Sequence, residues 1–261
     1  MPPYQQMAEI IRTEKLTDDI HRFTVKAEDM AAASRPGQFV MVRAGEGFDP
    51  LLRRPFSIHQ VAEGGLLQIL FKVVGKGTQN LAGLQAGQYM DLLGPLGRGF
   101  KQNSAPAHYL VGGGIGIAPL LFLAKKLLKK NEPAALKVLL GARTKAEIAL
   151  LVDDFKSMGL VVQAATEDGS LGLQGLVTDL LAPLHDEDGA MVYACGPHPM
   201  LRAVVGVSRD KGWACQASLE TIMACGIAAC LGCAVQRADL NGYVHACKDG
   251  PVFDSDEVAW L

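Results

Sequence analysis

Short segments in which apolar and polar residues alternate occupy the first hundred positions and predict β-strands. They are Ala8–Thr13, Ile20–Lys26, Gln38–Arg43, Pro55–Val61, Leu66–Val74 and Tyr89–Leu93. Turn-forming pairs such as Pro36-Gly37 and Gly64-Gly65 separate them. Six strands in so short a stretch favour a small antiparallel β-barrel. A short helix is expected after Gly75-Lys76-Gly77, with Thr78 as its N-cap, because a threonine hydroxyl can accept from the free N–H groups of a first turn.

Near residue 104 the pattern changes to alternating strands and helices. Strand-like apolar runs at Tyr109–Val111, Leu136–Leu140, Val161–Ala164 and Met191–Ala194 alternate with helical stretches ending near Lys130 and at 146–158, 175–181 and 199–211. This alternation predicts an α/β unit with an open parallel sheet and helices on both faces. The Gly- and Cys-rich tail, residues 213–261, is too small to form a hydrophobic core unaided, so we expect a metal cluster to stabilise its fold. The predicted domains are 1–103, 104–212 and 213–261.

Four cysteines near the C-terminus have the spacing of a metal site. Cys225, Cys230 and Cys233 follow the pattern C-x4-C-x2-C, and Cys247 follows after a gap of thirteen residues. This is the plant-type spacing of a [2Fe-2S] cluster, which is held by four thiolates. A structural zinc site and a disulfide-linked loop are the alternatives, because spacing alone does not identify a metal.

Composition excludes several other classes of protein. The chain has 261 residues, of which 49% are hydrophobic, and a formal net charge of −2, with its basic residues scattered. This argues against nucleic-acid binding. The N-terminus shows no signal-peptide pattern, and the longest apolar run, Ile115 to Ala124, is about half the length needed to cross a bilayer. We therefore expect no membrane association and a cytoplasmic location, where thiols stay reduced.

A glycine-rich turn after the strand at 109–111 could approach a pyrophosphate closely. It reads G-x-G-x-x-P from Gly114, and no acid follows the second strand, which ends in Gly141-Ala142-Arg143. The pattern is therefore weak, and the glycines could equally serve helix–sheet packing. Cys195-Gly196-Pro197 follows another strand of the same sheet, where ligands bind, although Cys195 could simply be a buried small residue.

Arg54, Pro55, Phe56 and Ser57 place a cation, a flat ring and a hydroxyl on one extended segment. These groups suit a phosphate and a flavin ring, although an ordinary edge strand could carry the same residues. The six histidines stand singly, and no Ser-His-Asp or Cys-His arrangement can be placed. The sequence thus offers no catalytic nucleophile or base.

Taken together, these segments resemble the ferredoxin–NADP reductase superfamily. The matching motifs are Arg54 to Ser57, Gly75-Lys76-Gly77-Thr78, Gly94-Pro95-Leu96-Gly97, Gly114 to Leu120, and Cys195-Gly196-Pro197 with Met200. Within that superfamily, the run from Glu220 through Cys225 to Phe253 resembles the electron-transfer subunits of NAD-dependent, B-type dihydroorotate dehydrogenases.

The resemblance implies three redox groups and assigns residues to each. FAD would be bound by Arg54, Pro55, Phe56, Ser57, Leu70, Phe71, Lys72, Val73, Gly77 and Thr78, and NAD(H) by Gly114, Gly116, Pro119, Cys195, Gly196 and Pro197. The [2Fe-2S] cluster would be bound by Cys225, Cys230, Cys233 and Cys247. The chain departs from the pattern at Phe56, where the superfamily has tyrosine, and at Ala228, where the family has glycine.

The implied function is electron transfer in pyrimidine biosynthesis. Electrons would pass from the FMN of a dihydroorotate-oxidising partner subunit through the cluster and FAD to NAD+, in a heterotetramer with two copies of each chain. The partner is needed because 261 residues leave no room for an additional eight-stranded α/β barrel. The alternatives are a flavin and iron–sulfur subunit of a hydrogenase or of a ferredoxin–NAD(P) transhydrogenase and, in another class, a zinc-stapled nucleotide-binding regulator.

Overall fold

The first six strands close into an antiparallel barrel, as the alternating pattern predicts. The computed structural model describes residues 4–45, 47–184 and 188–260. Around the barrel the strand order is β1-β2-β5-β4-β3-β6. The strands are β1 (Tyr4–Lys15), β2 (Ile20–Lys26), β3 (Phe39–Val42), β4 (Arg54–Ala62), β5 (Leu66–Lys72) and β6 (Tyr89–Leu96). Inward-facing side chains such as Phe23, Val25 and Ile69 fill its core.

Two short helices accompany the barrel, and one begins earlier than predicted. Helix α2 spans Lys76–Ala82 with Gly75 at its N-cap, so Thr78 lies within the first turn and the N-cap assignment was wrong. The Thr78 hydroxyl still accepts from backbone N–H groups, at 2.9 Å from Val74 N and 3.1 Å from Gly75 N. Helix α1 (Glu28–Ala33) was not predicted, because six residues are too few to show a helical period.

The second half of the chain forms a seven-stranded sheet in the order β10-β9-β8-β7-β11-β12-β15. All neighbouring strands are parallel except β12 and β15. The strands are β7 (His108–Gly113), β8 (Leu136–Ala142), β9 (Val161–Thr166), β10 (Leu173–Gln174), β11 (Met191–Cys195), β12 (Ala214–Ser218) and β15 (Val252–Asp254). This confirms the predicted open parallel sheet.

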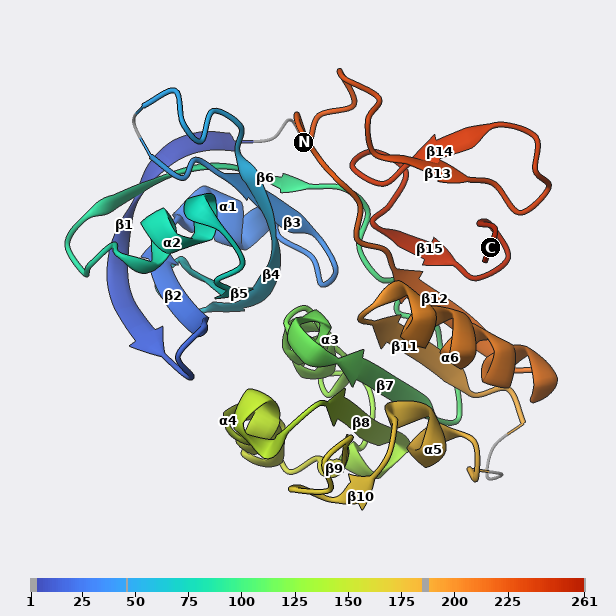
Figure 1. Cartoon of the computed structure of the whole chain (residues 1–261). Helices are drawn as coiled ribbons and strands as arrows, with labels where there is room; N and C mark the ends of the chain where they lie inside the picture. Colours follow the sequence, from blue (N-terminus) through green and yellow to red (C-terminus); the bar gives the residue numbers. More distant parts are fainter. Residues whose placement is uncertain (1–3, 46, 185–187, 261) are drawn as a thin grey trace.

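Helices cover both faces of this sheet (Figure 1). One face packs against α3 (Leu120–Leu127) and α4 (Lys145–Lys156), and the other against α5 (Val177–Leu181) and α6 (His198–Asp210). Two 3-10 turns, η1 (Gly114–Ile117) and η2 (Pro133–Ala135), precede α3 and β8. None of the helices within the described ranges is long and apolar enough to span a membrane.

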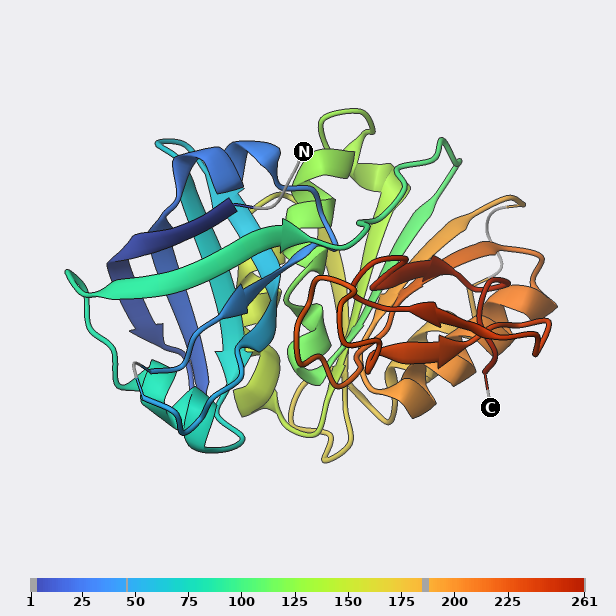
Figure 2. The ribbon, with the colours of Figure 1, turned by 90° about the horizontal axis from the view of Figure 1, so that it is seen from above.

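The cysteine-rich tail is attached to the sheet and also borders the barrel. Strand β12, directly after α6, and strand β15 near the C-terminus anchor the tail at the sheet edge. Between them, β13 (Ala234–Gln236) and β14 (Tyr243–His245) form an antiparallel hairpin. Seen from above, this segment lies beside both the barrel and the sheet (Figure 2).

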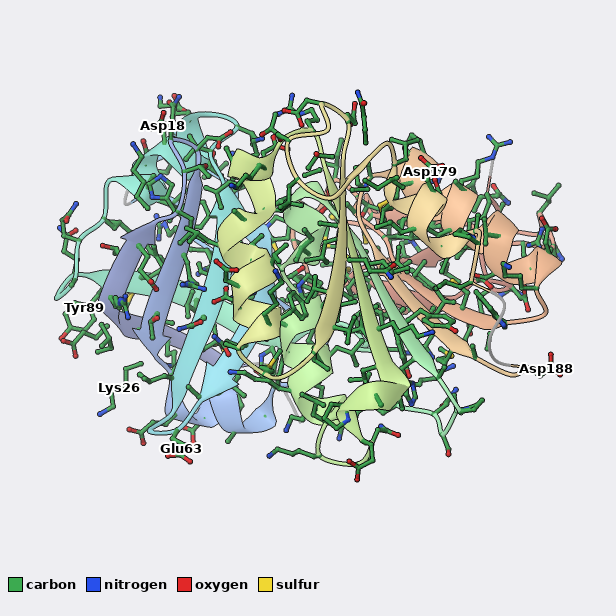
Figure 3. The ribbon with its side chains drawn as sticks, turned by 90° about the horizontal axis from the view of Figure 1, so that it is seen from below. Asp18, Lys26, Glu63, Tyr89, Asp179 and Asp188 are labelled. Atoms are coloured by element: carbon green, nitrogen blue, oxygen red, sulfur yellow. The ribbon has the colours of Figure 1, made fainter. Side chains whose placement is uncertain are left out.

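Helix α4 connects the sheet to the barrel through two ion pairs. Arg22 of β2 contacts Asp154 at 2.6 Å, and Lys72 of β5 contacts Glu147 at 3.2 Å. These acids are two helical turns apart and lie on one face of α4, which runs alongside the barrel strands in Figure 3. In addition, Phe122 of α3 is buried within the barrel core. The barrel and sheet therefore share a packed boundary.

Candidate functional site

The flavin-motif residues lie where β4 meets the start of α2. The Arg54 guanidinium extends over Gly77, because a Cβ built on that glycine would be only 3.1 Å from Arg54 Nε. Arg54 also donates to the Leu52 carbonyl oxygen at 2.6 Å. Its neighbour Arg53 instead pairs with Asp91, at 2.6 Å. A cation against closely approachable backbone fits a phosphate group.

The ring of Phe56 on β4 packs against the ring of Phe71 on the neighbouring strand β5. Its centroid lies 5.3 Å from that of Phe71, which is fully buried. Leu70 is buried as well, so the 70–73 segment could contact a flavin mainly through its backbone, with Lys72 as the exception. Ser57 is half-buried in β4. The structure thus brings together Arg54, Phe56 and Gly77 along β4 and α2, while their role in binding FAD stays a prediction.

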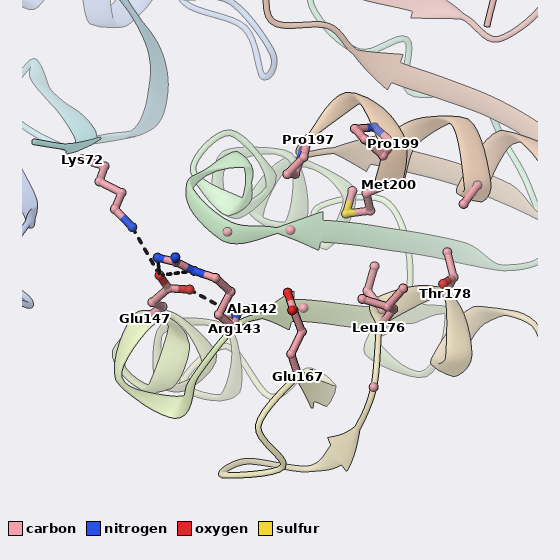
Figure 4. A pocket seen from close by; sticks show the side chains of 16 residues that line it. Lys72, Ala142, Arg143, Glu147, Glu167, Leu176, Thr178, Pro197, Pro199 and Met200 are labelled. Carbon is pink, nitrogen blue, oxygen red and sulfur yellow. Dashed lines mark hydrogen bonds and ion pairs between the residues drawn. The ribbon is translucent and has the colours of Figure 1, made fainter. Parts of the chain in front are cut away.

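A cavity of about 520 Å³ opens at the carboxyl ends of the parallel strands (Figure 4). Open α/β sheets bind their ligands at this edge. Two groups of residues form the apolar walls. On one side are Leu176, which precedes α5, and Val177, its first residue; on the other are Pro199, Met200 and Ala203 of α6. Gly113 and Gly114 lie at the end of β7, and Lys72 reaches in from the barrel. The cavity thus lies between the flavin-motif barrel and the sheet.

The predicted nicotinamide residues take different positions around this cavity. Gly114 and Pro197 line it. Gly116 packs directly against Gly196, since a Cβ at Gly116 would lie 2.5 Å from Gly196 Cα. Burial raises the pKa of the Cys195 thiol to about 12, so this residue acts as a small apolar group. Pro119 precedes α3.

Of the four charged residues that line the cavity, sequence reasoning missed Glu147 and Glu167 and assigned Lys72 to FAD. Arg143 Nη2 donates to Glu147 Oε1 at 2.6 Å, and Lys72 Nζ reaches the same oxygen at 3.2 Å. Burial raises the pKa of Glu147, but the hydrogen bonds from Arg143 and Lys72 outweigh it and lower that pKa below its usual value. Glu167, which follows β9, is the fourth charged residue. Only the fold brings these residues together, since they come from β5, α4 and the ends of β8 and β9.

The four motif cysteines lie on the hairpin and the loop before it. The structure brings Cys233 close to Cys247 and Cys225 close to Cys230, but gathers no three of these described residues into one group. Cys233 directly precedes β13 and Cys247 follows β14. Because Ala234 pairs with His245, the hairpin brings the two sulfur atoms to 3.2 Å. All six cysteines of the chain are free thiols. The disulfide alternative is therefore wrong for this structure.

Backbone N–H groups of the loop point at these sulfur atoms. Ala228 N lies 3.2 Å from Cys247 Sγ, and Ile227 N and Cys230 N lie 3.5 and 3.4 Å from Cys225 Sγ. Burial raises the pKa of Cys225, but the N–H groups outweigh it and lower the pKa to about 7. N–H groups directed at sulfur stabilise thiolates, so the loop fits an anionic iron–sulfur cluster.

The cluster loop contacts the barrel strand next to the flavin motif. Gly226 has a φ of 72°, and a Cβ there would lie 2.5 Å from Met41 Cγ of β3. In the β3–β4 register, Met41 pairs with Pro55. The buried side chain of Met41 and its strand β3 therefore lie between the cysteine loop and the Arg54 to Ser57 segment.

Comparison with known proteins identifies all three parts of the chain. Residues 7–100 match the oxidoreductase FAD-binding domain, residues 110–206 the oxidoreductase NAD-binding domain, and residues 220–259 the iron–sulfur cluster binding domain of dihydroorotate dehydrogenase B. The chain is therefore an oxidoreductase subunit with FAD-, NAD- and [2Fe-2S]-binding domains. These matches favour iron over the zinc alternative.

Proteins similar over their full length narrow this class to one family. The chain is 41% identical to the electron transfer subunit of dihydroorotate dehydrogenase B (NAD(+)) from Desulforamulus reducens, covering 97% of each protein, and 37% identical to that from Fusobacterium nucleatum, covering 94% of each. It belongs to the family of dihydroorotate dehydrogenase B electron transfer subunits.

Solved structures show the same architecture. A chain from the structure of an NADH-dependent reduced ferredoxin–NADP oxidoreductase has a TM-score of 0.84 and 33% identity, covering 98% of this chain and 90% of its own. A ferredoxin–NADP+ reductase from Neisseria gonorrhoeae, with a TM-score of 0.63 and 16% identity, covers 80% of this chain and 92% of its own; it shares the fold alone.

Proposed function

We propose that this chain transfers electrons from the FMN of a dihydroorotate-oxidising partner subunit, through its [2Fe-2S] cluster and FAD, to NAD+ in pyrimidine biosynthesis. The observation that carries this proposal is the contact of Gly226 with Met41, which places the cysteine loop next to the flavin motif. When bound, FAD exchanges a hydride with the nicotinamide and single electrons with the cluster.

The chain's own residues divide this work among three sites. Arg54 and Gly77 would hold the FAD phosphates, with Phe56 beside the flavin ring. Cys225, Cys230, Cys233 and Cys247 would ligate the cluster. The cavity at the sheet edge would hold NAD(H), with the Gly113–Gly114 turn at its phosphates. We propose the domain limits 1–103, 104–212 and 213–261, and a cytoplasmic location, which the free thiols support.

The proposed partner contact lies around the cluster loop. Ile222, Ile227 and Leu231 are 88%, 53% and 56% exposed. Apolar side chains exposed around a redox site are typical of a docking surface. The relatives are named electron transfer subunits, which supports a separate catalytic subunit. We propose an FMN-containing chain for it, in a heterotetramer with two copies of each subunit.

A second candidate function is a subunit of a ferredoxin–NAD(P) transhydrogenase. The similarity to the NADH-dependent reduced ferredoxin–NADP oxidoreductase, at 33% identity, favours it. The dihydroorotate dehydrogenase relatives, at 37% and 41%, are more similar over nearly the full length, and the cysteine domain matches their family. The dihydroorotate function is therefore preferred.

The division of labour can be tested with purified subunits. The isolated chain, loaded with FAD and iron–sulfur cluster, should reduce artificial acceptors with NADH but reduce no NAD+ with dihydroorotate until the FMN subunit is added. Ile222→Glu should slow only the coupled reaction, whereas Val161→Glu, which places the same charge at an exposed site on β9, should not. Dihydroorotate oxidation by this chain alone would refute the proposal. Coupling to reduced ferredoxin instead of the FMN subunit would support the second candidate.

A further inference from the structure

The motif Gly94-Pro95-Leu96-Gly97 at the end of β6 packs against the cysteine-rich tail. Leu96 of this motif and Met41 of β3 are buried and contact Gly226, the residue after Cys225. A Cβ built on Gly226 would lie 2.5 Å from Met41 Cγ, 2.9 Å from Met41 Sδ and 3.3 Å from Leu96 Cδ1. A side chain therefore fits at Gly226 only if the loop or Met41 moves.

The same motif makes a second close contact with the tail at Gly97. A Cβ on Gly97, whose φ is 74°, would lie 2.6 Å from Gly250 O and 2.7 Å from Pro251 Cδ. Arg98 N also donates to Gly250 O at 2.5 Å. Since Gly250 follows Cys247 in the sequence and Gly226 follows Cys225, the two glycine contacts hold both ends of the cysteine segment against the barrel.

Between these contacts the barrel and the cysteine hairpin share one apolar cluster. We call the seam its buried side chains Phe39, Met41 and Leu96 of the barrel together with Cys233, Ala246 and Cys247 of the tail. On its β4 side, strand β3 adjoins the flavin motif, because Phe39 pairs with Ser57 and Met41 with Pro55. Strand β3 thus contacts the cysteine loop through a side chain and the flavin motif through its backbone.

We propose that Gly226 and Met41 are positioning residues that fix the distance between the cluster and the flavin. This inference rests on the proposed electron transfer through both groups. An electron passes between the cluster and FAD without a bond being formed, so the rate depends on how closely the two groups are held. The seam is buried and close-packed, so it cannot accept an added methyl group without moving its parts. Glycine at position 226 therefore sets the closest approach of loop and barrel.

The test uses the full chain loaded with FAD and cluster. Gly226→Ala adds a methyl group that collides with Met41, and the double variant Gly226→Ala with Met41→Ala removes the colliding Cγ and Sδ atoms. The control is Gly64→Ala in the turn between β4 and β5, since Gly64 has a φ of 75° but nothing within 4 Å of a built Cβ. Ala228 has a φ of 61° in the same loop as Gly226, so a positive φ alone is compatible with the folded loop.

Two measurements report the position of the cluster. EPR of the chemically reduced protein measures the magnetic coupling between the reduced cluster and the flavin radical, which weakens with distance. In stopped-flow experiments a hydride from NADH reduces FAD by two electrons, of which one then passes to the oxidised cluster, and absorbance separates the two phases. Iron and FAD contents of the same samples show whether each variant holds both groups.

Gly226→Ala should weaken the magnetic coupling and slow the cluster phase relative to the flavin phase by about tenfold or more, because a displacement of about 1 Å can slow a reaction about 100-fold. The double variant should recover most of this loss, and Gly64→Ala should match the wild type. If Gly226→Ala loses iron, the double variant should regain it, because the collision with Met41 is then the cause.

Wild-type coupling and rates in Gly226→Ala would overturn the proposal, and so would a defect, in coupling or in iron content, that the double variant does not relieve. Absence of NADH-driven cluster reduction in the wild type would refute the proposed function instead. The EPR comparison of chemically reduced proteins needs no NADH, so it would still decide the role of Gly226 and Met41.

Discussion

The cluster loop and the nicotinamide cavity are assembled in opposite ways. The four cysteines lie within 23 residues, from Cys225 to Cys247, and one hairpin with its preceding loop carries all of them. The cavity takes residues from β5, the ends of three sheet strands and three helices, over a span from Lys72 to Ala203. A local site can be identified from spacing, whereas a dispersed site becomes visible only when the topology is known.

The largest expected effect comes from removing one cluster ligand. Cys230→Ser should abolish the cluster, because a serine oxygen is a poor substitute for thiolate on iron. Iron content and the reduced-state EPR signal measure this. The matched control is Cys215→Ser, since Cys215 is a free buried thiol of β12 outside the motif. Full iron content in Cys230→Ser, or its loss in Cys215→Ser, would show that the motif does not define the ligands.

A dispersed site should instead be sensitive to the contacts between its parts. His59 of β4 is fully buried and its Nδ1 lies 2.7 Å from the carbonyl oxygen of Ala118, next to the glycine turn. Burial lowers the pKa of His59 to about 4, against the opposite effect of that hydrogen bond. The pKa of His59 is lower in the folded protein than in the unfolded chain. The stability that neutral His59 contributes is therefore complete above about pH 6.5 and is lost as the pH falls toward 4.

The difference in pKa corresponds to about 3 kcal/mol of unfolding free energy. The thermal unfolding midpoint of the loaded protein, measured between pH 7 and pH 4.5, should fall less steeply in His59→Gln than in the wild type. His198→Gln, which changes an exposed histidine at the start of α6, should behave like the wild type. If all three proteins show the same slope, His59 does not control acid stability at this boundary.

The flavin motif is intermediate between the two sites, because four consecutive residues carry it but α2 completes it. Arg54→Ala should weaken FAD binding by about tenfold or more, since a charge-assisted contact to phosphate would be lost. FAD retention after dilution measures this. Arg53→Ala should lower stability while FAD is retained, because Arg53 pairs with Asp91 of the barrel. Loss of FAD from the Arg53 variant alone would reverse the two assignments.

The same contrast explains what sequence could predict of the fold. Strands β1 to β9 and β11 were located, because each has its own alternating or continuous apolar pattern. Strands β12 and β15 were missed: each is short, and its place in the sheet depends on partners far away in the sequence. Glu167 was missed for the same reason, because its position at the cavity depends on β8 and β9 being adjacent, which the sequence alone does not show.

The smallest expected effect concerns the departure from the family pattern at position 228. Ala228 has a φ of 61°, in the left-handed region that favours glycine, the residue that the resemblance leads us to expect there. Its N–H group lies 3.2 Å from Cys247 Sγ, so the backbone conformation itself serves the cluster. Ala228→Gly should relieve the strained φ but add chain entropy to the unfolded state and lose a partly buried methyl group.

These contributions nearly cancel, so Ala228→Gly should change the unfolding free energy by at most about 1 kcal/mol and leave iron content unchanged. Ala229→Gly is the matched control, because it adds the same conformational entropy to the unfolded chain. Ala229 has no positive φ and is exposed, so its replacement relieves no strain. Ala228→Gly should therefore be the more stable of the two by thermal unfolding. If it is the less stable one, the methyl group of Ala228 matters more to the loop than its strained backbone, and even the local site depends on contacts that spacing does not show.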